Sequence, residues 1–117
     1  NYEESIKSFQ KVVELDPKNV QAIYNLGLSY VFKGDAMNDE MNSRDYRSNA
    51  DFQADQKKVI EAYKPAVPVL ESAYEIDPKN ATVVETLKNL TFRLRDEEGM
   101  MAKYEKYNKA LNELKAQ

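Results

Sequence analysis

The chain has 117 residues and a formal net charge of −3, with 42% apolar and 32% charged residues, and it contains neither cysteine nor histidine. This length suits one modest domain or a short repeat array rather than a large enclosed core. Nucleic-acid binding is not expected without a basic patch, and catalysis, cofactors and metal sites are not expected without thiols and imidazoles. No run approaches the roughly 20 apolar residues that a membrane helix needs.

Residues 2–16 form the first predicted helix, which is amphipathic. Its apolar side chains recur mostly at intervals of three and four, and they are Tyr2, Ile6, Phe9, Val12, Val13 and Leu15. The residue before a proline is pushed out of the α region, so Asp16-Pro17 ends this helix and Asn19 caps the next. The same turn returns later, since residues 14–19 (ELDPKN) and 75–80 (EIDPKN) differ at one position. Such internal near-identity predicts a repeat architecture.

The second predicted helix begins at Val20. A large residue, a leucine, a glycine and a tyrosine share one of its faces, and they are Ile23, Leu26, Gly27 and Tyr30. A glycine on that face lets a second helix come close, whereas we assign the other two glycines, Gly34 and Gly99, to turns. The spacing resembles the opening of a tetratricopeptide repeat. The chain is thus similar to bacterial-type proteins of that family, and Ser5, Phe9 and Pro17 fall at the family's Ala, Phe and Pro positions.

An insertion interrupts the second repeat. Pro17 and Pro78 lie 61 positions apart, whereas the family's period is about 34 residues. We place the insertion at about residues 36–62 and expect it to lengthen both helices of the repeat. The resulting hairpin turns between Ser43 and Asp51 and projects beyond the stack. Its polar first half is expected to be mobile unless helix extension orders it.

Two prolines, Pro65 and Pro68, leave two interpretations of the next segment. Either one helix runs from about Asp51 to Ile76 and bends near Lys64, or a new helix begins near Lys64 with both prolines in its first turn. The first is favoured because the apolar spacing continues through the segment, at Tyr63, Val67, Leu70 and Tyr74.

The last two predicted helices cover residues 81–95 and 100–114. Val84 and Leu87 match the repeat pattern, but Lys88 replaces its glycine and Thr91 its tyrosine. We therefore expect an all-α, antiparallel helix-hairpin stack of about five helices in one domain, residues 1–117. Its parts are a half repeat (1–17), a repeat with the insertion (20–78) and a degenerate capping repeat (81–115).

The resemblance implies a non-enzymatic scaffold that binds a peptide or helix of a partner protein in its concave groove. Carrying over the family's groove face gives Gln21, Tyr24, Asn25, Leu28 and Phe32 from the second repeat, and Glu85, Asn89 and Arg93, with Thr82 and Thr86, from the third. Some relatives hold a terminal carboxylate with Asn and basic residues. Asn25 stands at one such position, but Thr82 and Thr86 occupy the basic ones, so no carboxylate clamp is expected.

Other functions stay open at this point. The helices could form a self-associating or capping segment of a larger assembly, or a non-catalytic domain of a larger enzyme. The first helix lacks the helix that would precede it, so we expect the chain to be a piece of a longer array. Its stripe of Tyr2, Ser5, Phe9 and Val12 would then pair with a second copy or fray, and a preceding helix would cover it in the intact protein. The cellular compartment is not indicated.

Overall fold

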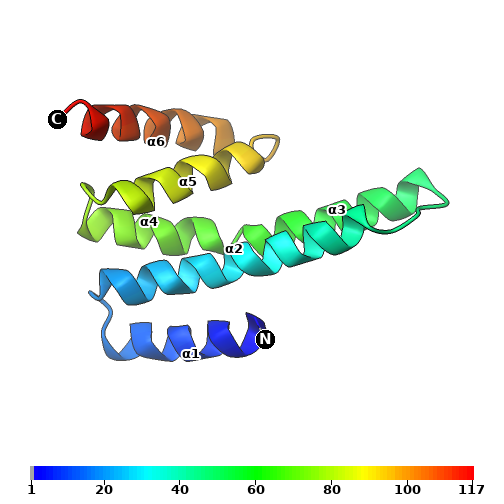
Figure 1. Cartoon of the computed structure of the whole chain (residues 1–117), viewed down its shortest axis with the longest axis horizontal. Coiled ribbons are helices and arrows are strands. Elements are labelled where there is room, and N and C mark those ends of the chain that lie inside the picture. The colour runs from blue at the N-terminus through cyan, green and yellow to red at the C-terminus, as the bar shows by residue number, and fades with distance from the viewer. Residues whose placement is uncertain (1) are drawn as a thin grey trace.

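A computed structural model describes residues 2–117, and over these residues it consists of six helices and no strand (Figure 1). The helices are α1 (Tyr2–Leu15), α2 (Val20–Asn42), α3 (Asn49–Tyr63), α4 (Ala66–Ile76), α5 (Ala81–Arg93) and α6 (Met100–Lys115). Successive helices run antiparallel, except that α4 follows α3 along nearly the same line. The predicted all-α hairpin stack with one lengthened helix pair is confirmed. None of the described helices is long and apolar enough to cross a membrane.

The repeated Asp-Pro-Lys-Asn turn has the same geometry in both places. After α1, the side-chain oxygen of Asn19 accepts a hydrogen bond from the Ala22 amide at 3.0 Å. After α4, Asn80 accepts one from the Val83 amide at 3.2 Å. Each asparagine therefore satisfies one of the amides that a helix start leaves free. The predicted caps of α2 and α5 are both present.

The segment with the prolines bends rather than breaks. Helix α3 ends at Tyr63 and α4 begins at Ala66, yet Lys64 (φ −52°, ψ −44°) and Pro65 (φ −60°, ψ −23°) both keep right-handed helical dihedrals. Pro65 has no amide hydrogen to give, which interrupts the hydrogen-bond ladder at this point. Counted as one bent helix, α3 and α4 give the five helices expected from the sequence.

Helices α2 and α3 form the projecting hairpin (Figure 1). Helix α2 is continuous for 23 residues, and the chain turns over residues 43–48, inside the range predicted for the turn. At the tip, the Tyr46 hydroxyl donates to Asp55 at 2.7 Å, and the Tyr46 ring meets that of Phe52 edge to face. Ser48 caps α3 by accepting from the Asp51 amide. Helix extension and these local contacts order the inserted segment.

Two glycines let α4 and the end of α3 approach α2 closely. A Cβ at Gly27 would lie 2.5 Å from Leu70 Cδ2, and one at Gly34 would lie 2.4 Å from Tyr63 Cδ1. The assignment of Gly34 to a turn is therefore wrong, because this residue is buried inside α2. The insertion prolongs the helix past Gly34, so the glycine serves close packing instead. Gly99 does lie in a turn, at φ 81°, before α6.

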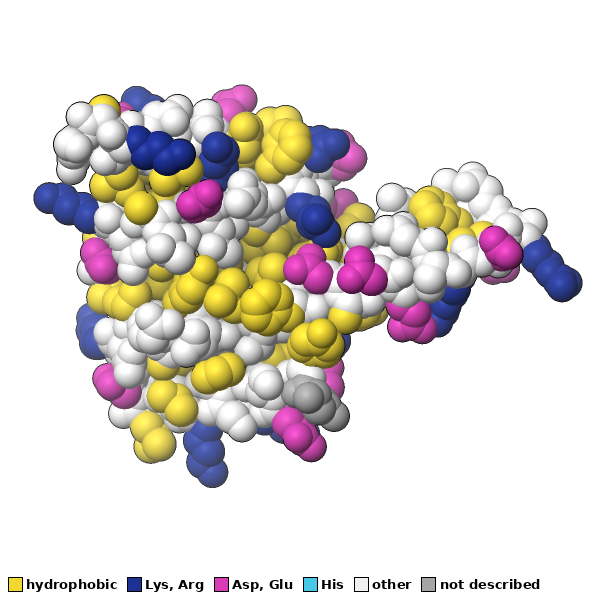
Figure 2. Space-filling model, in the orientation of Figure 1, with side chains coloured by type: hydrophobic (Ala, Val, Ile, Leu, Met, Phe, Trp, Pro, Cys, Tyr) yellow, Lys and Arg dark blue, Asp and Glu magenta, His cyan; other side chains and the backbone are white. Residues whose placement is uncertain are grey.

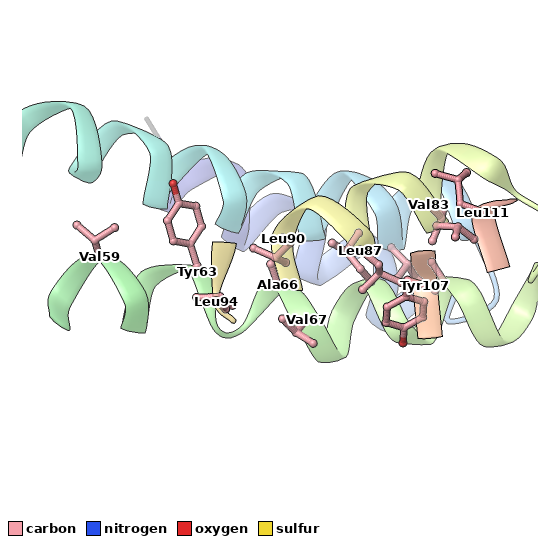
Figure 3. Packing of buried hydrophobic residues seen from close by; sticks show 14 of the residues in the cluster. Val59, Tyr63, Ala66, Val67, Val83, Leu87, Leu90, Leu94, Tyr107 and Leu111 are labelled. Carbon is pink, nitrogen blue, oxygen red and sulfur yellow. The ribbon is translucent and has the colours of Figure 1, made fainter. Parts of the chain in front are cut away.

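The core lies between the two layers of the stack. Buried side chains of α3 and α4 form one cluster with those of α5 and α6, and Figure 3 shows Val67 of α4, Leu87 of α5 and Tyr107 of α6 among them. The same view shows Tyr63 reaching from α3 toward α2. Tyr63 and Tyr107 are almost fully buried in this core.

Candidate partner-binding groove

Side chains of α2 and α5 meet at two points, and between these points they line a pocket that we call the groove. Near one end, the Tyr24 hydroxyl lies 3.0 Å from Thr86 Oγ1. The Thr86 hydroxyl itself donates to the Thr82 carbonyl at 2.9 Å, so Tyr24 is the donor to Thr86. Near the other end, Arg93 of α5 lies 3.4 Å from the carboxylate of Asp35 on α2. Two side-chain contacts thus fix the separation of the two helices.

A pocket of about 240 Å³ opens between these contacts. Its lining combines apolar and polar side chains from α2, α3 and α5, and they are Val31, Asp35, Tyr63, Thr86, Asn89, Leu90 and Arg93. Leu90 is buried and Val31 half-buried, whereas Asn89 and Arg93 are exposed. The pocket therefore has an apolar floor and a rim that can form hydrogen bonds, which is the usual make-up of a binding pocket.

Tyr63 organises the polar end of the pocket. Its hydroxyl donates to Asp35 Oδ1 and accepts from Arg93 Nη1, both at 2.5 Å. The Arg93 guanidinium also lies 5.3 Å from the centre of the Tyr63 ring. Burial, together with the hydrogen bond to Asp35, raises the pKa of Tyr63 from 10 to about 12. Tyr63 consequently stays neutral near pH 7 and holds Asp35 and Arg93 in a fixed arrangement.

Apolar side chains continue along α2 outside the pocket. Leu28 is half-buried and Phe32 is 50% exposed. Figure 2 shows a band of hydrophobic side chains across this face of the molecule, with acidic and basic side chains beside it near the base of the hairpin. At the start of α2, the Gln21 amide donates to Asn25 Oδ1 at 3.0 Å. The face thus offers both apolar area and amide groups to a ligand.

The structure brings together only some of the residues predicted for the groove. Asn89 and Arg93 line the pocket, and Tyr24 lies beside it through Thr86. Thr86, which was also carried over to the groove face, lines the pocket too. The other six do not line it, and they are Gln21, Asn25, Leu28, Phe32, Thr82 and Glu85. Whether any of them binds a partner stays a prediction.

Four pocket residues were not predicted: Val31, Asp35, Tyr63 and Leu90. Asp35 follows Val31 by one helical turn, so the sequence already indicates that the two residues lie on the same face of α2. Tyr63 comes from the end of the inserted segment, so only the fold brings it here.

A second polar cluster joins α4 to α6. Lys103 and Tyr107 both bond the carboxylate of Glu71, Lys103 at 2.8 Å and Tyr107 at 2.5 Å. Burial raises the pKa of the Tyr107 hydroxyl, and its bond to Glu71 raises it further. Burial also acts to raise the pKa of Glu71, but the hydrogen bonds from Lys103 and Tyr107 outweigh it and lower that pKa below its ordinary value. This cluster holds α6 against α4.

Among residues 2–117, no group of three acidic side chains is placed to hold a metal ion.

Stacked helical hairpins with a groove along one layer define the class of helical-repeat proteins. Residues 1–34 match the family model described as TPR repeat. The match covers α1 and α2 as far as Gly34, and beyond that point the inserted segment begins to lengthen the helix. This segment is therefore similar to a tetratricopeptide repeat, and such repeats generally mediate protein–protein interaction. No curated protein matches the chain.

Proposed function

We propose that the protein is a non-catalytic interaction scaffold that binds a peptide or helix of a partner protein along the groove between α2 and α5. The observation that carries the proposal is the pocket at the centre of this groove, with its apolar floor and its fixed polar end. A pocket of about 240 Å³ accommodates a side chain rather than a whole small molecule, since small-molecule sites are usually about 300 Å³ or larger.

The geometry suggests how a peptide would be held. An apolar side chain of the partner would enter between Val31 and Leu90, and its backbone would bond the exposed amide of Asn89. The Asp35 and Arg93 side chains already satisfy each other through Tyr63, so a neutral segment would bind without disrupting an ion pair. Phe32 would add apolar contact area beside the pocket.

The test is selection of peptides from a random displayed library against the 117-residue chain. Selected peptides would then be titrated against the wild-type chain and against Asn89→Ala and Phe32→Ala, which alter exposed side chains and leave the core intact. Both variants should bind about tenfold or more weakly. Lys109→Ala, on the exposed side of α6, is the control and should bind as the wild type does. Failure to enrich any peptide, or equal binding by all variants, would contradict the proposal.

A further inference from the structure

A second pocket, of about 270 Å³, lies where the hairpin meets the turn between α5 and α6. Figure 1 shows this turn next to the point at which α2 and α3 leave the stack. The floor of the pocket consists of buried apolar side chains, which belong to Met41, Val59 and Leu94. We call this pocket the hairpin notch.

The hairpin notch continues the groove. Tyr63 and Arg93 line both pockets, so the two pockets share one wall. Figure 2 shows the band of hydrophobic side chains running up to the base of the hairpin. Arg93 is held by Asp35 and by the Tyr63 hydroxyl. A neutral stretch of peptide can therefore cross the shared wall without meeting an unpaired charge.

Several polar groups around the hairpin notch have no partner within the chain. The side-chain amides of Asn38 and Gln56 form no hydrogen bond to residues 2–117, and the carboxylate of Asp96 forms no ion pair with them. Glu97, by contrast, is paired with Lys64 at 2.8 Å. The notch thus offers two amides to a peptide backbone and one unpaired carboxylate to a basic side chain.

We propose that the partner segment bound in the groove continues over Tyr63 into the hairpin notch. There it places a second apolar side chain on the floor of the notch and a lysine or arginine beside Asp96. This inference rests on the proposed function and specifies the chemistry of its partner. The partner segment is extended, and it carries two apolar side chains with a basic residue next to one of them.

The inserted segment builds most of the hairpin notch. Asn38, Met41, Gln56, Val59 and Ile60 all line it, and all fall within residues 36–62, the segment that the repeat period marks as inserted. Without these residues, α2 and α3 would not extend past the end of α5, and the binding surface would end at the shared wall. The insertion would thereby lengthen the binding surface as well as the two helices.

The probes for the experiment are peptides selected against the 117-residue chain from a displayed library of about 15 random residues, which span about 50 Å when extended. Each peptide would be titrated against matched pairs of variants at exposed positions. Asp96→Lys is compared with Glu98→Lys, which makes the same change of charge outside the notch. Gln56→Ala is compared with Gln53→Ala, which lies about one turn earlier on α3 and also outside the notch.

Asp96→Lys should weaken binding by about tenfold at low salt and by less at high salt, because salt screens a charge at an exposed rim. Gln56→Ala should weaken binding by about threefold or more, since it removes a hydrogen bond to the peptide. Both control variants should bind as the wild type does. The selected peptides should share a basic residue next to an apolar one.

The pattern of losses separates this inference from the proposed function. Peptides that bind Asn89→Ala more weakly, but Asp96→Lys and Gln56→Ala as tightly as the wild type, would leave the groove function standing and overturn its extension into the notch. Peptides that respond to the notch variants alone would overturn both, since nothing would then occupy the groove. A dimer in sedimentation that Asp96→Lys abolishes and Glu98→Lys preserves would assign the notch to a second copy of the chain, which also overturns the proposal.

Discussion

Residues 2–17 and 63–78 have the same turn and the same apolar register, but their surroundings differ. Helix α4 packs against both α2 and α5, whereas the main packing of α1 within residues 2–117 is against α2. Phe9 is half-buried and its counterpart Leu70 is fully buried. The amphipathic pattern thus indicates which face of each helix is apolar. How much of that face is buried depends on how many helices pack against it.

The sharpest test of this comparison is truncation at the paired positions. Leu70→Ala should lower the free energy of unfolding by about 3 to 5 kcal/mol, because it leaves a cavity under Gly27. Phe9→Ala should lower it by only about 1 kcal/mol, since the ring is already partly in water. Urea unfolding followed by circular dichroism measures both. Equal losses would show that α1 is as well supported as α4.

Gly27 gives the next largest effect. Alanine has the higher helix propensity by about 1 kcal/mol, but its Cβ would meet Leu70 at 2.5 Å. We expect the clash to prevail, with a net loss of about 1 to 2 kcal/mol. Lys88 stands at the corresponding place in α5 and is half-buried, so Lys88→Ala should change stability by less than about 0.5 kcal/mol. A Gly27→Ala variant more stable than the wild type would contradict the close approach of α4.

The paired tyrosines should differ as well. Tyr63→Phe removes the hydroxyl that joins Asp35 to Arg93 and should cost about 1 kcal/mol. The Tyr2 hydroxyl makes no hydrogen bond to the described residues, so Tyr2→Phe should be neutral within about 0.5 kcal/mol. Thermal unfolding of the two variants provides the measurement.

The raised pKa of Tyr63 also predicts that the stability of the chain depends on pH in the alkaline range. The pKa of Tyr63 is raised from 10 to about 12 in the folded chain, so its contribution to stability is complete below pH 10 and is lost as the pH rises toward 12. Tyrosinate absorbance and unfolding, followed together over this range, should show a smaller alkaline loss of stability in Tyr63→Phe than in the wild type. An equal loss in both would assign the effect to other groups.

The smallest expected difference between the two segments concerns the Asp-Pro-Lys-Asn turn that they share. Asn19→Ala and Asn80→Ala each remove one helix cap and should each cost about 1 kcal/mol. Capping is local, so the two losses should agree within a few tenths of a kcal/mol despite the different burial of α1 and α4. A large difference between them would mean that the turn also depends on its neighbours.

The sequence alone was enough to predict what local chemistry decides. It predicted the helix starts at Asn19 and Asn80, the packing role of Gly27 and the place of the hairpin turn. It could not predict the role of Gly34, because a glycine before a polar segment has the pattern of a turn until the helix is known to continue. The contact of Asp35 with Arg93 joins residues 58 positions apart. It exists because the hairpin passes the end of α5, which no local pattern encodes.

Helix α2 is continuous from the stack into the hairpin, so it can transmit a movement of the hairpin tip to the stack. At about 1.5 Å per residue its 23 residues span about 35 Å. Beyond the stack, α3 is the helix that packs against it within residues 2–117. A force on the tip would reach the stack at Gly34 and Tyr63, beside the pocket. Because the chain has no cysteine, spin labels can be attached at Arg47→Cys in the hairpin turn and at Lys109→Cys on α6. The distance between the two labels would then report on the position of the hairpin relative to the stack. A narrow distance distribution is expected if α2 acts as a rigid arm, whereas a broad one would show that it bends.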